Sequence, residues 1–157
     1  MLYLSCSYSF VPLIWCFKGG VMGDLSKNFD TTEFACKCGC GFNTISLKLV
    51  QKLQNLREAW GFPIVVNSGC RCFEHNRSIS GSRNSYHLNG MGSDITVGSI
   101  SQIVEEKGLD KAFVMLEFKN FCWTEFDGNG IIFYPAKKIV HVDVRGYRYQ
   151  PFPDLSS

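Results

Sequence analysis

The segment IVHVDV at residues 139–144 constrains the fold more than any other stretch, because apolar and polar side chains alternate along it. Successive side chains of a β-strand point to opposite faces. The three valines therefore lie on one face, whereas His141 and Asp143 share the other. Since an apolar face has to pack into a core, the segment predicts a half-buried strand that presents an imidazole and a carboxylate side by side.

Residues 45–61 predict an amphipathic helix. Apolar side chains recur every three or four residues along ISLKLVQKLQNLREAW, and Gly61 then ends the pattern. The recurring residues are Ile45, Leu49, Leu53, Leu56 and Trp60. We expect this face to be buried and the lysines, glutamines and arginine of the helix to be solvated.

Short strands and one more helix complete the pattern. Runs typical of strands are PIVVNSG (63–69), SDITV (93–97), GIIFYP (130–135) and KIVHVDVRG (138–146), the last two joined as a hairpin through PAKK. SISQIVEEKG (99–108) predicts a helix with a serine cap and a glycine stop. Residues 110–126 fit a buried helix and a strand equally well. Because helices and strands are mixed without regular alternation, we expect an α+β fold and not a doubly wound sheet.

The length and net charge of the chain limit the classes of function that it can have. A chain of 157 residues is sized for one domain with a real core. A formal net charge of +2, without a run of Lys and Arg interleaved with aromatics, argues against nucleic acid as the partner. The first 17 residues are almost uncharged but short for a membrane span, and no Lys or Arg precedes Lys18. We expect residues 1–22 to be an apolar tail or an atypical signal outside the fold, and residues 23–157 to form one domain.

The eight cysteines leave several interpretations open. Five of them lie in the short motifs CKCGC (36–40) and CRC (70–72). Alternate spacing is poor for a simple zinc ribbon, which usually has two residues between paired thiolates. The motifs are compatible with reduced buried thiols, with a disulfide clip or a structural metal, and least with a catalytic thiol, because no local histidine base accompanies them.

Two of the three histidines have surroundings that suggest a metal site. His87 lies in the loop SYHLNGMGSD (85–94), and Asp94 stands at the start of the strand that follows. Glycines at 90 and 92 allow the loop to fold back so that His87 and Asp94 converge. Together with His141 they make two imidazoles and one carboxylate, a ligand set of catalytic zinc. The alternatives are a surface histidine in a polar loop, a satisfied strand histidine, and an aspartate that only caps or bridges.

Read together, three segments resemble a known family. In order, SGCRCFEHNR, NSYHLNGMGSDI and FYPAKKIVHVDVRG are similar to the zinc D-alanyl-D-alanine carboxypeptidase family of peptidoglycan peptidases, which shares its fold with the hedgehog signalling domain. The family signature S-x-H-x-x-G-x-A-x-D is matched at Ser85, His87, Gly90 and Asp94, with Gly92 in place of the alanine. RCFEHN likewise resembles the family's RCPEHN. The resemblance covers roughly residues 25–146.

The resemblance implies a fold and a site. The fold is a small antiparallel sheet with helices packed on one side and zinc at the sheet face. The implied zinc ligands are His87, Asp94 and His141. Arg71 takes the place of a substrate-binding arginine that hydrogen-bonds the scissile carbonyl or a substrate carboxylate and stabilises the oxyanion. Ser85 is implied to contact the substrate or support the ligand loop. Tyr134, just before Pro135 and the hairpin, is a candidate to shape the substrate groove, with a packed aromatic as the alternative.

The general base is the point at which this chain departs from the family. Many relatives carry an acid three residues before the last histidine ligand, where this chain has Lys138. Asp143 is the candidate, as base or as an acid that orients His141, and Glu74 is the fallback.

Together these observations predict a zinc peptidase that acts as a monomer on bacterial peptidoglycan peptides, next to a D-amino acid. It would work at the cell wall or in the periplasm, or be released from the cytoplasm as a phage-type lysin. The alternative is a zinc-stabilised binding domain without turnover, as in the hedgehog relatives. A cysteine-cluster metal would be a second, structural ion.

Overall fold

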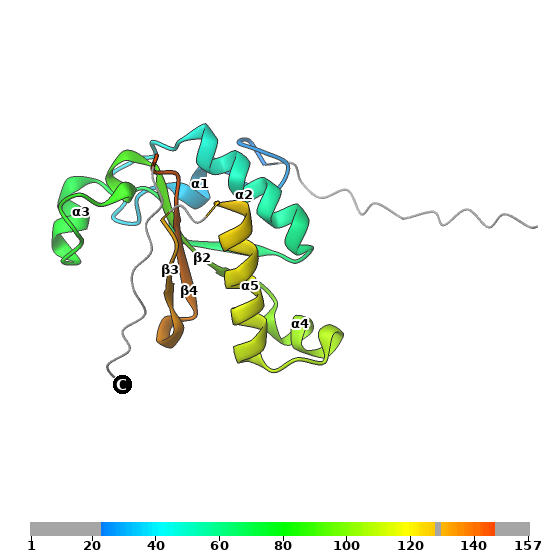
Figure 1. Cartoon of the computed structure of the whole chain (residues 1–157). Helices are drawn as coiled ribbons and strands as arrows, with labels where there is room; N and C mark the ends of the chain where they lie inside the picture. Colours follow the sequence, from blue (N-terminus) through cyan, green and yellow to red (C-terminus); the bar gives the residue numbers. More distant parts are fainter. Residues whose placement is uncertain (1–22, 128–129, 147–157) are drawn as a thin grey trace, which may run out of the picture.

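The computed structural model describes residues 23–127 and 130–146 (Figure 1). The expectation for residues 1–22 therefore lies outside the described residues. Within the described part of the chain, no helix combines the length and the apolar character needed to cross a bilayer.

Four strands form one antiparallel sheet in the order β1-β2-β4-β3. Their bounds are β1 Ile64–Ser68, β2 Gly92–Val97, β3 Ile132–Tyr134 and β4 Ile139–Asp143. The predicted hairpin is confirmed: β3 and β4 pair and are joined by the short 3₁₀ helix η2, Pro135–Lys137. Lys138 completes this turn with a left-handed backbone, φ 54°. Each strand coincides with a segment that the sequence predicts as a strand, except that β2 begins one residue earlier, at Gly92.

Three longer helices, α2 Leu47–Trp60, α4 Ile100–Lys107 and α5 Lys111–Glu125, accompany the sheet. Two short helices, α1 Thr31–Phe34 and α3 Phe73–Ser78, and the 3₁₀ helix η1, Tyr86–Asn89, lie in the connections. Residues 110–126, which fit a helix and a strand equally well in the sequence, contain the helix α5. Asp110 caps it by accepting hydrogen bonds from the backbone N–H groups of Ala112 and Phe113, at 2.8 and 2.9 Å.

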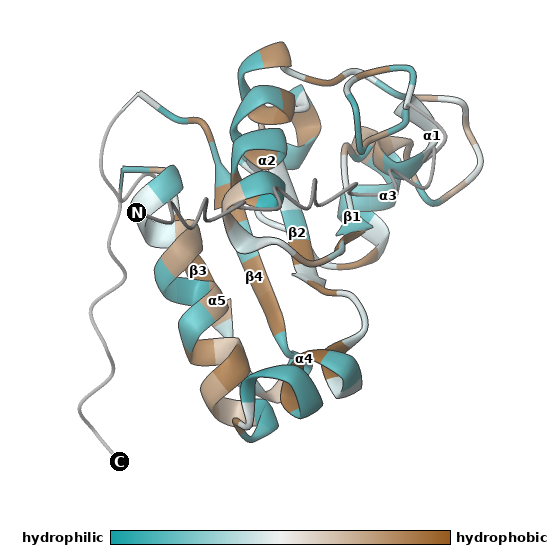
Figure 2. Cartoon of the chain, turned by 90° about the vertical axis from the view of Figure 1, so that its right-hand side faces the viewer, coloured by the Kyte–Doolittle hydropathy of each residue, from teal (hydrophilic) through white to brown (hydrophobic). Residues whose placement is uncertain are grey.

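The hydrophobic core lies between the helices and the apolar face of the sheet. Figure 1 shows α2 and α5 on one side of the sheet, with α3 beyond the other side. The predicted face of α2 is buried at Leu49, Leu53, Leu56 and Trp60, and the Trp60 ring lies 5.3 Å from that of Phe118 in α5. In Figure 2 the ribbon of β4 is largely hydrophobic, whereas α2 and α4 carry both hydrophilic and hydrophobic stretches, as amphipathic helices do.

The valines of β4 confirm the prediction made from alternation. Val140 and Val142 are fully buried, and Val144, just beyond the strand, is 5% exposed. The architecture is thus the α+β class expected, with a small antiparallel sheet. Because the core covers one face of this sheet, side chains on the opposite face are available to form a functional site.

Candidate metal centre

Strand register brings two distant residues together on the face of the sheet opposite the core. Asp94 of β2 pairs directly with His141 of β4, and Ser68 of β1 pairs with Asp94. Residues paired in this way across neighbouring strands project to the same face. Asp94 and His141, 47 positions apart in sequence, are consequently in contact, with Oδ1 of Asp94 2.9 Å from Nδ1 of His141.

The loop ahead of β2 delivers His87 to the same place. Ser85 caps η1 through a hydrogen bond that its Oγ accepts from the His87 backbone N–H at 3.4 Å. Gly90 ends η1 with φ 64°, and a Cβ there would lie 2.2 Å from the Thr44 carbonyl oxygen, so only glycine fits. His87 itself is 2% exposed. Gly90 thus allows the loop to fold back and bring His87 towards Asp94, as the sequence suggested.

Gly92 has a different task, because it lies in β2 and has no left-handed backbone. A Cβ at this position would lie 3.1 Å from the Tyr86 Cβ and 3.2 Å from Cε1 of His141. Contacts this short would press on the imidazole. Glycine, in place of the family's alanine, leaves room around His141.

The donor atoms of His87, Asp94 and His141 form a closed triangle. Nε2 of His87 lies 3.2 Å from Nδ1 of His141 and 3.3 Å from Oδ1 of Asp94, and the third side is the 2.9 Å contact already described. All three side chains are buried or nearly so. The three residues that the sequence proposes as metal ligands are therefore brought to one point.

Hydrogen bonds on the far side of each imidazole favour a lone pair on the ring nitrogen that faces the triangle. Nδ1 of His87 lies 2.6 Å from the Gly69 carbonyl oxygen, which only accepts, so Nδ1 carries the proton and Nε2 carries a lone pair. Nε2 of His141 lies 3.2 Å from Oδ2 of Asp143, which can keep a proton on Nε2 while Nδ1 gives its lone pair to a metal. Three donor atoms that meet at about 3 Å offer their lone pairs to one cation, which would take the place of the protons that otherwise lie between them.

Zinc fits this donor set. Tetrahedral ligands at about 2.0–2.1 Å from zinc are separated from one another by roughly 3.3 Å, and the triangle has sides of 2.9–3.3 Å. The Asp94 carboxylate accepts from the Arg71 guanidinium through Oδ2, and this charged partner favours the ionised form. Asp94 is therefore available as an anion.

Arg71 fixes the orientation of the Asp94 carboxylate. Its Nη2 donates to Oδ2 of Asp94 at 2.5 Å, and its Nε donates to the Ser68 hydroxyl at 3.0 Å. The Arg71 backbone N–H also donates to the His87 carbonyl at 2.9 Å. Since Oδ2 is held by the guanidinium, Oδ1 is the oxygen that faces the two imidazoles.

Asp143 is completely buried behind His141 and is satisfied on both oxygens. Oδ1 accepts from the backbone N–H and the Nε of Arg145, at 3.1 and 2.6 Å, and Oδ2 accepts from Nη2 of Arg145 as well as from His141. Sequence reasoning did not single out Arg145. The signal was present, because positions 141, 143 and 145 share one face of the extended chain.

The position of the Asp143 side chain requires a glycine at residue 130. An added Cβ at Gly130 would lie 2.0 Å from the Asp143 carboxyl carbon. Gly130, at the start of the GIIFYP segment, thus lets its backbone pass directly beside the buried carboxylate.

A groove of about 690 Å³ lies above the triangle. Its lining includes the three proposed ligands together with Arg71, Ser85, Tyr86, Tyr134, Lys137 and Arg145. Ser85 and Tyr134 thus both line this groove. Glu74 does not line it: this residue stands in the exposed first turn of α3 and pairs with Arg77 at 2.9 Å.

Two imidazoles and a carboxylate that converge below an open groove are the donor set of single-zinc hydrolase sites, in which a fourth position is left for water. A family model described as Peptidase M15 matches residues 27–143, and the chain belongs to this family of zinc-dependent metallopeptidases. The match confirms the resemblance to the zinc D-alanyl-D-alanine carboxypeptidase type. A comparison with curated proteins gives no significant match.

Proposed function

We propose that this chain is a zinc peptidase that hydrolyses stem or cross-link peptides of peptidoglycan next to a D-amino acid. The observation that carries the proposal is the closed triangle of His87, Asp94 and His141 at the bottom of an open groove. Bound zinc would supply an activated water and polarise the scissile carbonyl. Binding and orientation fall to side chains that line the groove or lie directly behind it.

The charge of the groove suits peptides that carry carboxylates. Its cations are Arg71, Lys137 and Arg145, and Asp94 is the one carboxylate among the lining residues that the structure describes. Two of these cations are already paired with aspartates, whereas the Lys137 ammonium lies 5.9 Å from the centre of the Tyr134 ring. We propose that Lys137 and Tyr134 receive the substrate at the β3–β4 end of the groove, and that Lys137 attracts a substrate carboxylate.

Arg71 is proposed to act on the reaction in two ways. Through Nη2 it keeps Asp94 in the orientation that directs Oδ1 to the imidazoles. With the remaining N–H groups of its planar fork it would donate to the scissile carbonyl as negative charge develops there. Ser85 is proposed to support the ligand loop, because its hydroxyl caps the 3₁₀ turn that carries His87.

For Asp143 the contacts favour the orienting role over that of the base. Its Oδ2 accepts from Nε2 of His141, which keeps Nδ1 free for the metal. Its burial and its bonds with Arg145 leave neither oxygen exposed to a water in the groove. The alternative base, Glu74, is on the surface of α3.

One observation keeps a second function in consideration. Among the described residues that line the groove, no carboxylate other than the proposed ligand Asp94 is present to accept a proton. This favours the alternative of a zinc-stabilised binding domain that holds a cell-wall peptide without cutting it.

Mass spectrometry of muropeptides separates the two functions and names the bond. The purified protein is incubated with peptidoglycan sacculi and with soluble stem peptides, and the products are examined for released D-Ala or new amino termini. We expect cleavage that stops on chelation and returns with zinc, and no cleavage by His87→Ala. Glu74→Gln serves as the matched acid-to-amide control and should cleave normally.

Two results would count against the proposal, and a third would revise the assignment of the base. Intact peptides bound in a zinc-dependent manner would establish the binding domain instead. Cleavage that persists after zinc is removed would exclude the mechanism. Loss of cleavage in Glu74→Gln, with metal content unchanged, would move the base to Glu74.

A further inference from the structure

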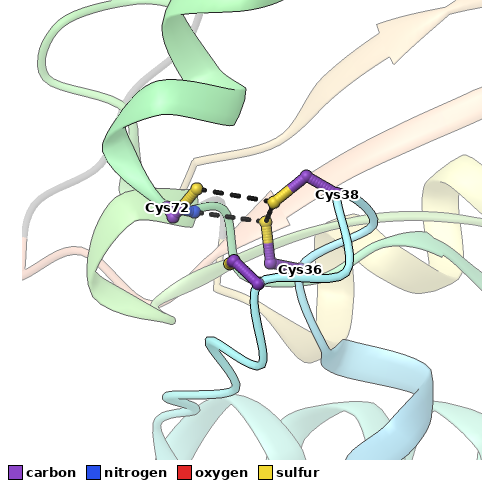
Figure 3. Close-up of side chains that lie close together, drawn as sticks. Cys36, Cys38 and Cys72 are labelled. Atoms are coloured by element: carbon purple, nitrogen blue, oxygen red, sulfur yellow. Dashed lines mark hydrogen bonds between the residues drawn. The ribbon is translucent and has the colours of Figure 1, made fainter.

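A second group of metal-binding side chains lies outside the groove. The sulfurs of Cys36, Cys38, Cys40 and Cys72 all lie within 4.8 Å of one another. Figure 3 shows Cys36 and Cys38 on one loop meeting Cys72 at the start of α3. Sγ of Cys38 lies 3.4 Å from Sγ of Cys36 and 3.6 Å from Sγ of Cys72. The cluster joins two segments more than 30 residues apart.

The backbone of the CKCGC loop explains how alternate cysteines converge. In an extended strand, residues i and i+2 are separated by roughly 6.6 Å, too far for their sulfurs to share one ion. Here Gly39 and Gly41 both have φ 78°, and the backbone N–H of Cys36 donates to the Phe42 carbonyl at 2.8 Å. The loop therefore closes on itself and gathers its thiols, which the spacing alone did not predict.

The sulfur separations fit a shared metal better than a disulfide. Zinc–sulfur bonds of about 2.3 Å in a tetrahedron place the sulfurs roughly 3.8 Å apart, whereas a disulfide requires about 2.05 Å. The observed 3.4 and 3.6 Å lie close to the first value. In the structure all four cysteines are free thiols.

We propose that Cys36, Cys38, Cys40 and Cys72 bind a structural zinc ion, separate from the metal of the groove. Four thiolates select a soft tetrahedral metal and leave no open position for water, so this ion would stabilise the fold and take no part in hydrolysis. Each thiol gives up its proton to solvent as it binds, which makes the affinity fall at low pH.

Hydrogen-bond donors around the sulfurs support thiolates at this place. The backbone N–H of Cys72 donates to Sγ of Cys36 at 3.3 Å, and the backbone N–H of His75 donates to Sγ of Cys72 at 3.4 Å. Nδ1 of His75 also lies 3.2 Å from Sγ of Cys36. We assign His75 as a hydrogen-bond partner of Cys36 and Cys40 as the fourth ligand, because the group whose ligand atoms all lie within 4.8 Å consists of four sulfurs.

The cluster would stabilise the backbone that carries Arg71, one of the residues that line the groove. Arg71, which orients the ligand Asp94, immediately precedes Cys72 in the chain. The adjoining backbones are tightly packed: the N–H of Cys70 donates to the Phe34 carbonyl at 2.8 Å, and a Cβ on Gly69 would lie 2.4 Å from the Phe34 Cα. A metal that ties Cys72 to the CKCGC loop therefore restrains the backbone of Arg71.

Metal analysis of the full chain, purified under reducing conditions, tests the proposal. We expect two zinc ions per chain, falling to one in Cys72→Ser and in His87→Ala. Cobalt substituted for zinc should give thiolate-to-cobalt charge-transfer absorption, which disappears in Cys72→Ser and persists in His87→Ala. Cys122→Ala is the matched control, because Cys122 is a buried cysteine of α5 outside the cluster; it should keep two ions and the absorption band.

A single replacement in the exposed part of the loop guards against loss of folding. Cys40 is exposed, so Cys40→Ser should fold and lose one zinc. One zinc in the reduced wild-type chain without the charge-transfer band would overturn the site, as would a disulfide between cluster cysteines in the chain as isolated. Two ions in Cys40→Ser but one in His75→Ala would overturn the assignment of the fourth ligand.

Discussion

Replacing Asp143 by asparagine is the sharpest test of how the groove metal is held. The carboxylate accepts two N–H groups on each oxygen: from the backbone and Nε of Arg145 on Oδ1, and from His141 and Nη2 of Arg145 on Oδ2. An amide keeps the shape but turns one of these acceptors into a donor. Whichever way the amide is turned, its NH₂ faces two groups that also donate.

The loss in stability follows from burial. Asp143 is 0% exposed and Arg145 8% exposed, so the substitution leaves a buried guanidinium without its anion. Removing one partner of a buried pair costs about 3–5 kcal/mol. If the NH₂ faces His141 instead, the ring relieves the conflict by moving its proton to Nδ1, the atom that faces Asp94 and His87. Metal affinity should then fall about 10–100-fold, as for other losses of a partner behind a ligand.

Two measurements on Asp143→Asn test the predicted loss of stability and the predicted loss of zinc affinity. Urea unfolding of the metal-free chain gives the change in free energy of unfolding, and competition with a chromophoric chelator gives the zinc affinity. Asp127→Asn is the matched control, because Asp127 pairs with Lys52 at 3.2 Å but is 73% exposed, and an exposed pair contributes about 0–1 kcal/mol. If Asp143→Asn unfolds like the control and binds zinc as tightly as the wild type, the role assigned to this carboxylate is refuted.

Three further substitutions have expected outcomes. Gly90→Ala should lower the free energy of unfolding in urea by clearly more than Gly108→Ala, because its Cβ would lie 2.2 Å from a carbonyl oxygen. Gly108 has the same φ of 64° but no atom within 4 Å of an added Cβ, so Gly108→Ala should cost only about 1–2 kcal/mol. Equal losses would refute the steric argument. Arg71→Lys should lower zinc affinity about 10–100-fold in chelator competition, because the fork that orients the ligand carboxylate is lost, and an unchanged affinity would contradict this. Leu53→Ala should cost about 2–5 kcal/mol and Leu47→Ala less than about 0.5 kcal/mol, since Leu53 is 0% and Leu47 76% exposed; similar values would mean that α2 is not packed as described.

Much of the fold could be predicted from periodicity. The pattern of Leu49, Leu53, Leu56 and Trp60 predicted α2, and alternation predicted β4, because in both cases one face of the element had to be apolar. Residues 110–126 could not be assigned in the same way. Their apolar side chains are too dense for either period to stand out, and their helical form shows in the cap at Asp110 and in packing against Trp60.

The ligands of the groove could be proposed from the sequence, but their partners could not. The motif around His87 and Asp94 and the strand of His141 carried a recognisable resemblance. Arg145 was overlooked although alternation places it on the same face as His141 and Asp143, because alternation gives the face of a side chain and not its partner. The cysteines were left with open alternatives, since alternate spacing predicts divergence in a strand and convergence only in a turn such as the one at Gly39 and Gly41.

The sequence by itself determined which side chains of β4 face the core and which face the groove, because alternation is a property of one strand and needs no partner. Only the tertiary structure decided that Asp94 stands opposite His141, that a guanidinium holds each of Asp94 and Asp143, and that Cys72 meets the CKCGC loop. These are contacts between segments distant in the chain or turned by backbone geometry. Register and packing fix them, and neither is written in the spacing of residues along one element.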